Sequence, residues 1–214
     1  PPRPGRHYVV ECSSYQIDLA PTLDPTVGLH MNLSPDHLDR HGTLENYAAI
    51  KERLVAGAKV AIVGVDDRLS SMIADRLELA RKPVCRIAGE RELTDGIYAY
   101  HGRLIEAHDG AQTEVALLAG IDSLRGDHNG QNAAAAFACL RALEIPADQI
   151  AAAMKSFPGL HHRMEIVART GRTLFINDSK ATNADAAARA LASFDRIYWI
   201  AGGRAKAGGI SSLD

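Results

Sequence analysis

The chain has 214 residues, and its 24 Lys and Arg against 26 Asp and Glu give a formal net charge of −2. This balance favours neither nucleic acid nor a membrane surface as a partner, and 46% hydrophobic with 23% charged residues is typical of a globular protein. No apolar run approaches the roughly 20 residues that span a bilayer, and no secretory leader is recognisable. The length fits one domain with part of a second. Because the sequence opens on Pro1 rather than Met, we expect a segment of a longer protein.

The three cysteines, Cys12, Cys85 and Cys139, are widely spaced and form no C-x-x-C pair. Their odd number argues against a disulfide framework, and their spacing argues against a zinc ribbon. We therefore expect reduced thiols in a cytoplasmic protein.

The first part of the chain alternates between strand and helix patterns. Short apolar runs predict strands at residues 7–11, 27–33, 59–65 and 84–88. Apolar residues at helical spacing predict helices at 44–56, with Thr43 as the N-cap, and at 66–80. This alternation, with short connections, indicates an α/β fold with a mostly parallel sheet.

The pattern changes after residue 96. The runs 97–100 and 103–106 flank His101-Gly102 and predict a hairpin, to which 114–118 adds a strand. Helices are expected at 129–143 and 147–156. The sheet should therefore carry a small antiparallel patch.

A domain boundary is expected at Phe157-Pro158-Gly159, where Pro and Gly interrupt the pattern, so the predicted domains are residues 1–157 and 158–214. In the second, the sequence predicts strands at 164–168, 173–176 and 196–201 and a helix at 183–192. This order is typical of the start of a Rossmann-like, doubly wound domain.

Polar residues gather where the first two predicted strands end. Glu11 is followed by C-S-S-Y-Q, and the second strand runs into N-L-S-P-D-H-L-D-R-H at residues 32–41. Ligands of open α/β sheets bind beyond the carboxyl ends of strands, where a carboxylate can hold Mg²⁺. A metal or phosphate site is one interpretation, and polar loops that only hydrogen-bond are the other. The H-x-H-x-D-H order of two-metal hydrolases is missing.

Lys51 lies in the predicted helix 44–56 beside small and apolar residues. A solvated surface lysine is the simplest interpretation. Partial burial would instead lower its pKa, and a neutral amine can react with CO₂ to give a carbamate, which is an anionic metal ligand.

Two further loops lead into helices. G-D-H-N-G-Q-N, residues 126–132, places Asn129 and Asn132 on one face near a helix N-terminus, which suits a phosphate or nucleotide, although a simple cap is the alternative. N-D-S-K-A-T-N, residues 177–183, places Asp178 and Lys180 at a strand end, where they can bond a ribose and an anion. Glycine pairs at 202–203 and 208–209 would let the backbone approach a ligand, but they match no phosphate-loop pattern.

As a set, these strings resemble the Mur ligases. The chain contains, in the order of that family, E-C-S-S-Y-Q, N-L-S-P-D-H-L-D-R, Y-x-x-I-K, G-D-H-N-x-x-N-A-A-A-A, L-x-H-R-M-E and N-D-S-K-A-T-N. The resemblance covers nearly the whole chain, and the last string is most similar to the members that add D-glutamate.

The resemblance implies a central ATPase-type α/β domain followed by the start of a doubly wound C-terminal domain that binds the amino acid. It implies ATP-dependent amide-bond formation through an acyl phosphate in peptidoglycan precursor synthesis. The expected cofactors are ATP and Mg²⁺, and the expected substrates are UDP-N-acetylmuramoyl-L-alanine and D-glutamate. A cytoplasmic monomer without nucleic-acid or membrane partners is expected.

The resemblance also assigns roles to individual residues. Metal ligands would be Glu11, His37 and Lys51, with His37 and the carbamylated Lys51 as the catalytic pair. ATP contacts would be Asn129, Asn132, Arg163 and Asp178, the last at the ribose. Ser13 and Gln16 would lie near the muramoyl substrate, and D-glutamate would be held by Lys180, Thr182 and Lys206.

By the same resemblance, the family's phosphate loop and nucleotide-sugar domain lie outside this sequence, so the segment alone should be inactive. Two alternatives remain open. One is an amide ligase of the same superfamily that uses another amino acid, and the other is a non-catalytic nucleotide-binding module descended from such a ligase.

Overall fold

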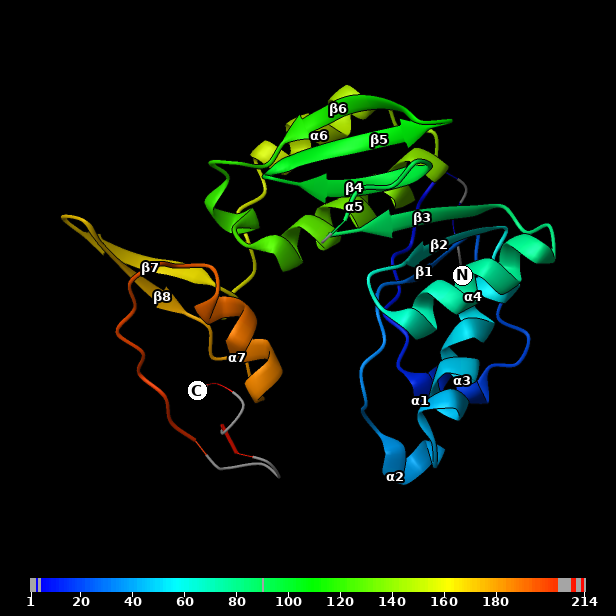
Figure 1. The fold of residues 1–214 in the computed structure, drawn as a ribbon, viewed down its shortest axis with the longest axis horizontal. Helices are drawn as coiled ribbons and strands as arrows, with labels where there is room; N and C mark the ends of the chain where they lie inside the picture. The colour runs from blue at the N-terminus through cyan, green and yellow to red at the C-terminus, as the bar shows by residue number, and fades with distance from the viewer. Residues whose placement is uncertain (1–2, 4, 90, 204–208, 211–212, 214) are drawn as a thin grey trace. The chain divides into compact units, whose positions relative to one another are not determined.

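The structure is a computed structural model that describes the chain except for residues 1–2, 4, 90, 204–208, 211–212 and 214 and the side chain of Asp185 (Figure 1). The chain divides into two compact units, residues 1–86 and 87–214. The predicted boundary at Phe157–Gly159 lies inside the second unit and stays a prediction. Among the described residues, no helix is long and apolar enough to cross a membrane.

The first unit contains, in chain order, α1 (Ser14–Leu19), β1 (Val27–His30), α2 (Leu38–His41), α3 (Leu44–Gly57), β2 (Val60–Gly64) and α4 (Arg68–Leu79). β1 and β2 are parallel, from Val27 opposite Val60 to His30 opposite Val63. β2 belongs to the core, because Ala61, Ile62 and Val63 are inaccessible to solvent. Thr43 and Asp67 cap α3 and α4 by accepting hydrogen bonds from Asn46 N and Ser70 N.

β3 (Val84–Ala88) runs into the second unit, which continues with β4 (Gly96–Tyr100), β5 (Arg103–His108) and β6 (Ala111–Leu117). β3 and β4 are parallel, whereas β4, β5 and β6 are joined by antiparallel pairs. The strands follow the order β1-β2-β3-β4-β5-β6, which confirms the mixed sheet with its antiparallel patch.

A short 3₁₀ helix, Asp122–Leu124, leads into α5 (Asp127–Ala142) and α6 (Ala147–Lys155), which cover one face of β4, β5 and β6 (Figure 1). Small residues let α5 approach this face closely, since a Cβ on Gly130 would lie only 2.7 Å from Ala99 Cβ. The unit then continues through the hairpin β7 (Glu165–Thr170) and β8 (Thr173–Asn177) to α7 (Ala184–Leu191), which Asn183 caps.

Two predicted strands are wrong: residues 7–11 and 196–201 are not strands in the structure. A strand needs a neighbour to pair with its backbone amides and carbonyls. No described strand pairs with either segment, and the apolar side chains of Val9 and Ile200 are 102% and 98% exposed. An apolar run alone therefore did not distinguish a strand from an unpaired extended segment.

Two short helices were not predicted. α1 begins with a capping box, in which Ser13 Oγ accepts from Gln16 N and Gln16 Oε1 accepts from Ser13 N. The S-x-x-Q pattern at residues 13–16 is the sequence signal for this start. α2 is a single turn that begins after His37, whose φ of 53° is left-handed.

Candidate functional site

A cluster of four rings occupies the region between α1, α2 and α3. This ring cluster consists of Tyr15, His37, His41 and Tyr47. The Tyr15 and His37 centroids are 5.2 Å apart, and His41 stacks on Tyr47 at 5.3 Å. The His37 ring lies 6.4 Å from that of Tyr47. The ring contacts therefore place the imidazole of His37 against side chains from two helices.

His41 anchors the cluster. Its Nε2 atom lies 2.9 Å from Ser14 Oγ, and both residues are buried. This hydrogen bond joins α2 to the first turn of α1. His41 ends the D-H-L-D-R-H string, but no sequence signal pointed to this anchoring role.

His37 itself lies in a conformation that non-glycine residues seldom adopt, with φ of 53°. Asp36 stabilises it, since Asp36 Oδ1 accepts a hydrogen bond from His37 N at 2.9 Å and Oδ2 lies 3.6 Å from His37 Nε2. The imidazole is 44% exposed, which leaves it accessible to a ligand. Backbone strain at a polar, accessible imidazole is a feature of functional loops.

Lys51 lies one helical turn after Tyr47 on α3, and its Nζ is 5.3 Å from the centroid of the Tyr47 ring. Burial lowers the pKa of Lys51 below its ordinary value, although the carboxylates of Asp36 and Asp67 act in the opposite direction. His37 and Lys51, predicted to act together, thus both lie against Tyr47. Their role as metal ligands stays a prediction.

Near Lys51, a buried polar pair joins β1 to α4. His30 Nε2 lies 2.8 Å from Ser70 Oγ, and both side chains are buried. Burial and the nearby Lys51 lower the pKa of His30 to about 4, with Asp67 acting in the opposite direction. His30 is therefore neutral at pH 7, and sequence analysis did not identify this pair.

Asp67 connects the start of α4, which carries Ser70, to the loop that carries His37. Its carboxylate accepts hydrogen bonds from Ser70 N and Leu33 N, both at 2.9 Å. Leu33 in turn packs in a small core with Tyr47 and Ala48. Asp67 therefore fixes the chain just after β1 and, at the same time, places negative charge near Lys51.

The other predicted residues of the first unit lie at α1. Ser13 and Gln16 bond to each other in the capping box, with 2.8 Å between Ser13 N and Gln16 Oε1. Their polar groups therefore hold the helix start, and contact with a substrate stays a prediction. Glu11 is exposed just before this helix, and its role as a metal ligand stays a prediction.

In the second unit, the two predicted asparagines lie together at the start of α5. Asn129 Nδ2 donates to Arg125 O at 2.7 Å, and Asn132 Nδ2 donates to Asn129 Oδ1 at 3.1 Å. Beside them lies a cavity of about 370 Å³, lined on one side by Gly126, Asp127 and Gly130. Such a volume is within the range of small-molecule sites, and the helix N-terminus favours an anionic ligand.

The segment just before α5 lies close to the segment that follows α7. The Arg125 guanidinium carbon lies 5.1 Å from the centroid of the Phe194 ring. Burial first, and then Arg189, lower the pKa of His128, while Asp178 and Asp127 raise it. Asp178 is thus close enough to the helix start to influence His128, and a shared ATP site stays a prediction.

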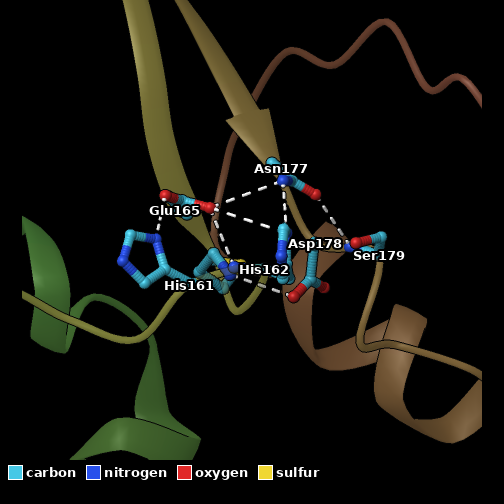
Figure 2. Close-up of polar contacts among 7 residues, drawn as sticks. His161, His162, Glu165, Asn177, Asp178 and Ser179 are labelled. Atoms are coloured by element: carbon cyan, nitrogen blue, oxygen red, sulfur yellow. Dashed lines mark hydrogen bonds and ion pairs between the residues drawn. The ribbon is translucent and has the colours of Figure 1, made fainter.

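Arg163 lies two residues before β7 and Asp178 directly follows β8, at the end of the hairpin where Glu165 pairs with Asn177. The side chains of His162 and Asp178 lie close together there (Figure 2). Asp178 Oδ1 accepts a hydrogen bond from Met164 N at 3.0 Å, so the two predicted ATP contacts are linked through the backbone. Lys180 N donates to His162 O at 3.0 Å, and the side chains of Lys180 and Thr182 are exposed. Lys206 lies outside the described residues.

Asp95, His108 and Asp109 also bring potential metal ligands together. All three side chains are exposed, and His108 is 86% accessible. Exposed acidic groups commonly lie close together without an ion, so we assign no metal site there.

Comparison with known proteins identifies the class to which this fold and these loops belong. Residues 3–140 match the Mur ligase middle domain, so the chain belongs to the Mur ligase family. Over 213 residues it is 62% identical to the UDP-N-acetylmuramoylalanine--D-glutamate ligase of Rhizobium meliloti (strain 1021). That alignment covers 100% of this chain and 46% of the relative, so the chain spans about half the length of the curated relatives it matches.

Solved structures of Mur ligases confirm the fold. A UDP-N-acetylmuramoyl-L-alanyl-D-glutamate--2,6-diaminopimelate ligase aligns with a TM-score of 0.60 at 22% identity, over 85% of this chain and 38% of that one. The MurF ligase from Thermotoga maritima in complex with ADP aligns with a TM-score of 0.56 at 20% identity, over 84% of this chain and 42% of that one. At these identities the likeness concerns the fold alone.

Proposed function

We propose that the whole protein containing this chain joins D-glutamate to UDP-N-acetylmuramoyl-L-alanine at the expense of ATP, in peptidoglycan precursor synthesis. The observation that carries the proposal is the 62% identity over 213 residues to a ligase of that name. The helix with Lys51 and the loop with Asp178 support it, because each carries polar groups that such a reaction needs. The three cysteines are free thiols, which fits a cytoplasmic protein.

The chemistry starts from a carboxylate, which is a poor acyl donor. An oxygen of the alanine carboxylate attacks the γ-phosphorus of ATP, and ADP leaves. The amine of D-glutamate then attacks the carbonyl carbon of the acyl phosphate and loses a proton, and inorganic phosphate leaves with the C–O bonding electrons. Both steps bring anions together, so positive charge must surround the reacting groups.

The first unit would hold Mg²⁺ through Glu11, His37 and the carbamate of Lys51. The fit rests on the structure's own donor set: an exposed carboxylate, an accessible imidazole, and a partly buried lysine whose pKa is lowered. Carboxylate and carbamate oxygens are the hard ligands that Mg²⁺ prefers. When bound, the ion would neutralise phosphate charge, while Tyr47 keeps His37 and Lys51 in place.

The second unit would bind ATP through Asn129, Asn132, Arg163 and Asp178. The cavity beside α5 supplies space, and the Asp178 carboxylate retains an oxygen for the ribose after bonding Met164 N. Arg163 would place its guanidinium against phosphate or base. Ser13 and Gln16 would contact the muramoyl substrate, and Lys180, Thr182 and Lys206 would hold D-glutamate.

Phosphate release by the whole protein tests this function. We expect release from ATP only when Mg²⁺, UDP-N-acetylmuramoyl-L-alanine and D-glutamate are all present. Glu11→Gln should reduce the rate by about 100-fold or more, because it removes a charged ligand at the reacting phosphates. Glu45→Gln, at an exposed position in the first turn of α3, is the matched control and should leave it unchanged.

Other amino acids separate the alternatives. Activity with L-lysine, diaminopimelate or L-alanine in place of D-glutamate would assign the protein to another amide ligase. Nucleotide binding without turnover in the whole protein would instead favour a non-catalytic module.

A further inference from the structure

The backbone around Arg163 has an unusual conformation. The residues on both sides of it, His162 and Met164, have left-handed φ angles of 64° and 48°. Neither is glycine, and each such residue costs free energy, so the conformation persists only where the surroundings hold it. The surrounding contacts must therefore hold this loop in place.

Two carboxylates bond the two strained residues (Figure 2). Glu165 Oε2 accepts a hydrogen bond from His162 N at 2.8 Å, and Asp178 Oδ1 accepts one from Met164 N at 3.0 Å. Arg163 N, between them, donates to Leu160 O at 3.2 Å. Each backbone amide from His162 to Met164 thus has an acceptor. The acceptors of the two residues that flank Arg163 are carboxylates.

Glu165 also joins this loop to the end of β8. Its Oε1 lies 2.8 Å from His161 Nδ1, and its Oε2 accepts from Asn177 Nδ2 at 3.4 Å. Asn177 in turn lies against His162 Nδ1 at 2.9 Å, and its Oδ1 accepts from Ser179 N at 3.2 Å. The hydrogen bond from His162 N, and then that from His161, lower the pKa of Glu165, so it is a carboxylate at neutral pH.

Arg163 is exposed, and its guanidinium has no hydrogen bond or ion pair within the described part of the chain. The backbone of residues 162–164 therefore fixes the point from which this exposed side chain extends. The backbone depends on Glu165 on one side and on Asp178 on the other.

We propose that Glu165 is a positioning residue of the nucleotide site, which fixes the loop that presents Arg163 and connects it to the Asn177–Asp178 loop. This inference rests on the proposed function for the use of Arg163 and Asp178 in binding ATP. Glu165 does not touch the nucleotide; it acts through the backbone of residues 162–164.

Steady-state kinetics of the whole protein test this role. Glu165→Ala should raise KM for ATP about tenfold, while kcat and KM for D-glutamate change less than about twofold, because only the nucleotide contact is displaced. Glu165→Gln, which keeps one acceptor oxygen, should have an intermediate effect and covers the case in which the alanine variant does not fold. A fall in kcat with an unchanged KM for ATP would overturn the proposal.

Two matched variants serve as controls. His161→Ala removes only the contact with a side chain that is 90% exposed, and KM for ATP should change less than about twofold. Glu114→Ala removes an exposed carboxylate that pairs with Arg103 on the β5–β6 hairpin, and it should leave KM unchanged. An equal increase in all three variants would mean that Glu165 has no special role.

Amide hydrogen exchange separates this inference from the proposed function, because it needs no substrate. Glu165→Ala should speed exchange at His162 and Met164 by about tenfold or more in the whole protein, and unchanged exchange would overturn the positioning role. If exchange rises but the unmodified protein neither binds ADP nor consumes ATP, the proposed function fails and the nucleotide role of Glu165 fails with it.

Discussion

Two titratable side chains of the first unit, the partly buried Lys51 and the buried His30, lie close enough for the charge of Lys51 to influence His30. Each is kept from its charged form by burial, and the nearby Lys51 lowers the pKa of His30 further. Asp67 favours the charged form of both. Lys51 therefore interacts with charged or titratable groups on several sides. Its protonation state matters because only the neutral amine can react with CO₂.

A carbamate on Lys51 is the first prediction at this scale. Because burial lowers the pKa of Lys51, more of its amine is neutral and reactive at a given pH than in an exposed lysine. ¹³CO₂ labelling of the whole protein should give a carbamate carbon signal that Lys51→Arg abolishes, with kcat reduced by about 100-fold or more. Lys155→Arg, at an exposed position, should retain both signal and rate. A signal that persists in Lys51→Arg would exclude this site.

His30 predicts how stability depends on pH. Its pKa in the folded protein is about 4, below the ordinary 6.5, so the unfolded chain takes up the proton first as the pH falls. The stability from neutral His30 is therefore present above pH 6.5 and is lost as the pH falls from 6.5 towards 4. Between pH 7 and pH 5 the loss should be about 1–2 kcal/mol.

Hydrogen exchange of the β1 and β2 amides at pH 7 and pH 5, corrected for intrinsic rates, measures this loss. His30→Asn cannot titrate and should remove most of the pH dependence, whereas His101→Asn, in an exposed turn, should not change it. Equal slopes in the two variants would contradict the assignment to His30.

At the scale of elements, the packing of β1 against α3 determines how the loop with His37 meets the helix with Lys51. Gly28 of β1 makes this contact possible. A Cβ at that position would lie 2.8 Å from both Ala58 Cβ and Leu54 O, and 3.1 Å from Val55 Cα. Two of these three neighbours are backbone atoms, so rotation of a side chain cannot relieve the clash.

Gly28→Ala should therefore destabilise the first unit by about 1–3 kcal/mol, because the strand must move away from the helix. Exchange of the β1 amides should report the loss, and the phosphate-release rate should fall as His37 shifts relative to Lys51. Gly202→Ala is the control for amide exchange, since a Cβ there meets nothing within 4 Å. Unchanged exchange and rate in Gly28→Ala would show that the strand and helix accommodate the added methyl group, and would contradict the prediction.

The elements that could be predicted from sequence are those whose signal is local. α3 and α4 have caps and helical periodicity, and the β4–β5 hairpin has alternation around His101-Gly102. The runs at 7–11 and 196–201 have strand composition, but pairing is a property of the neighbouring chain and cannot be read from the run itself. The same holds for the site: Lys51 was recognisable by resemblance, whereas the His30–Ser70 bond joins residues 40 positions apart.

At the scale of the whole molecule, the proposed chemistry divides between the units. The ring cluster and Lys51 belong to the first, and the second contains Asn129 at the start of α5 and the loops with Arg163 and Asp178. A further division at Phe157–Gly159 would separate the α5 loop from the loop with Arg163. At that connection, Ser123 Oγ donates to Phe157 O at 2.6 Å, and Gly159 has a positive φ of 86°.

Limited proteolysis of the whole protein tests this boundary. Phe157 is 38% exposed, and chymotrypsin should cleave after it early in digestion. Ser123→Ala removes the bond to Phe157 O and should speed that cleavage several-fold, since a buried or paired carbonyl resists local opening. Ser156→Ala is the matched control, because Ser156 Oγ bonds only Ala153 O within its own helix end. Cleavage that is equally fast in both variants, or that avoids residues 155–163, would mean that the domains divide elsewhere in the chain.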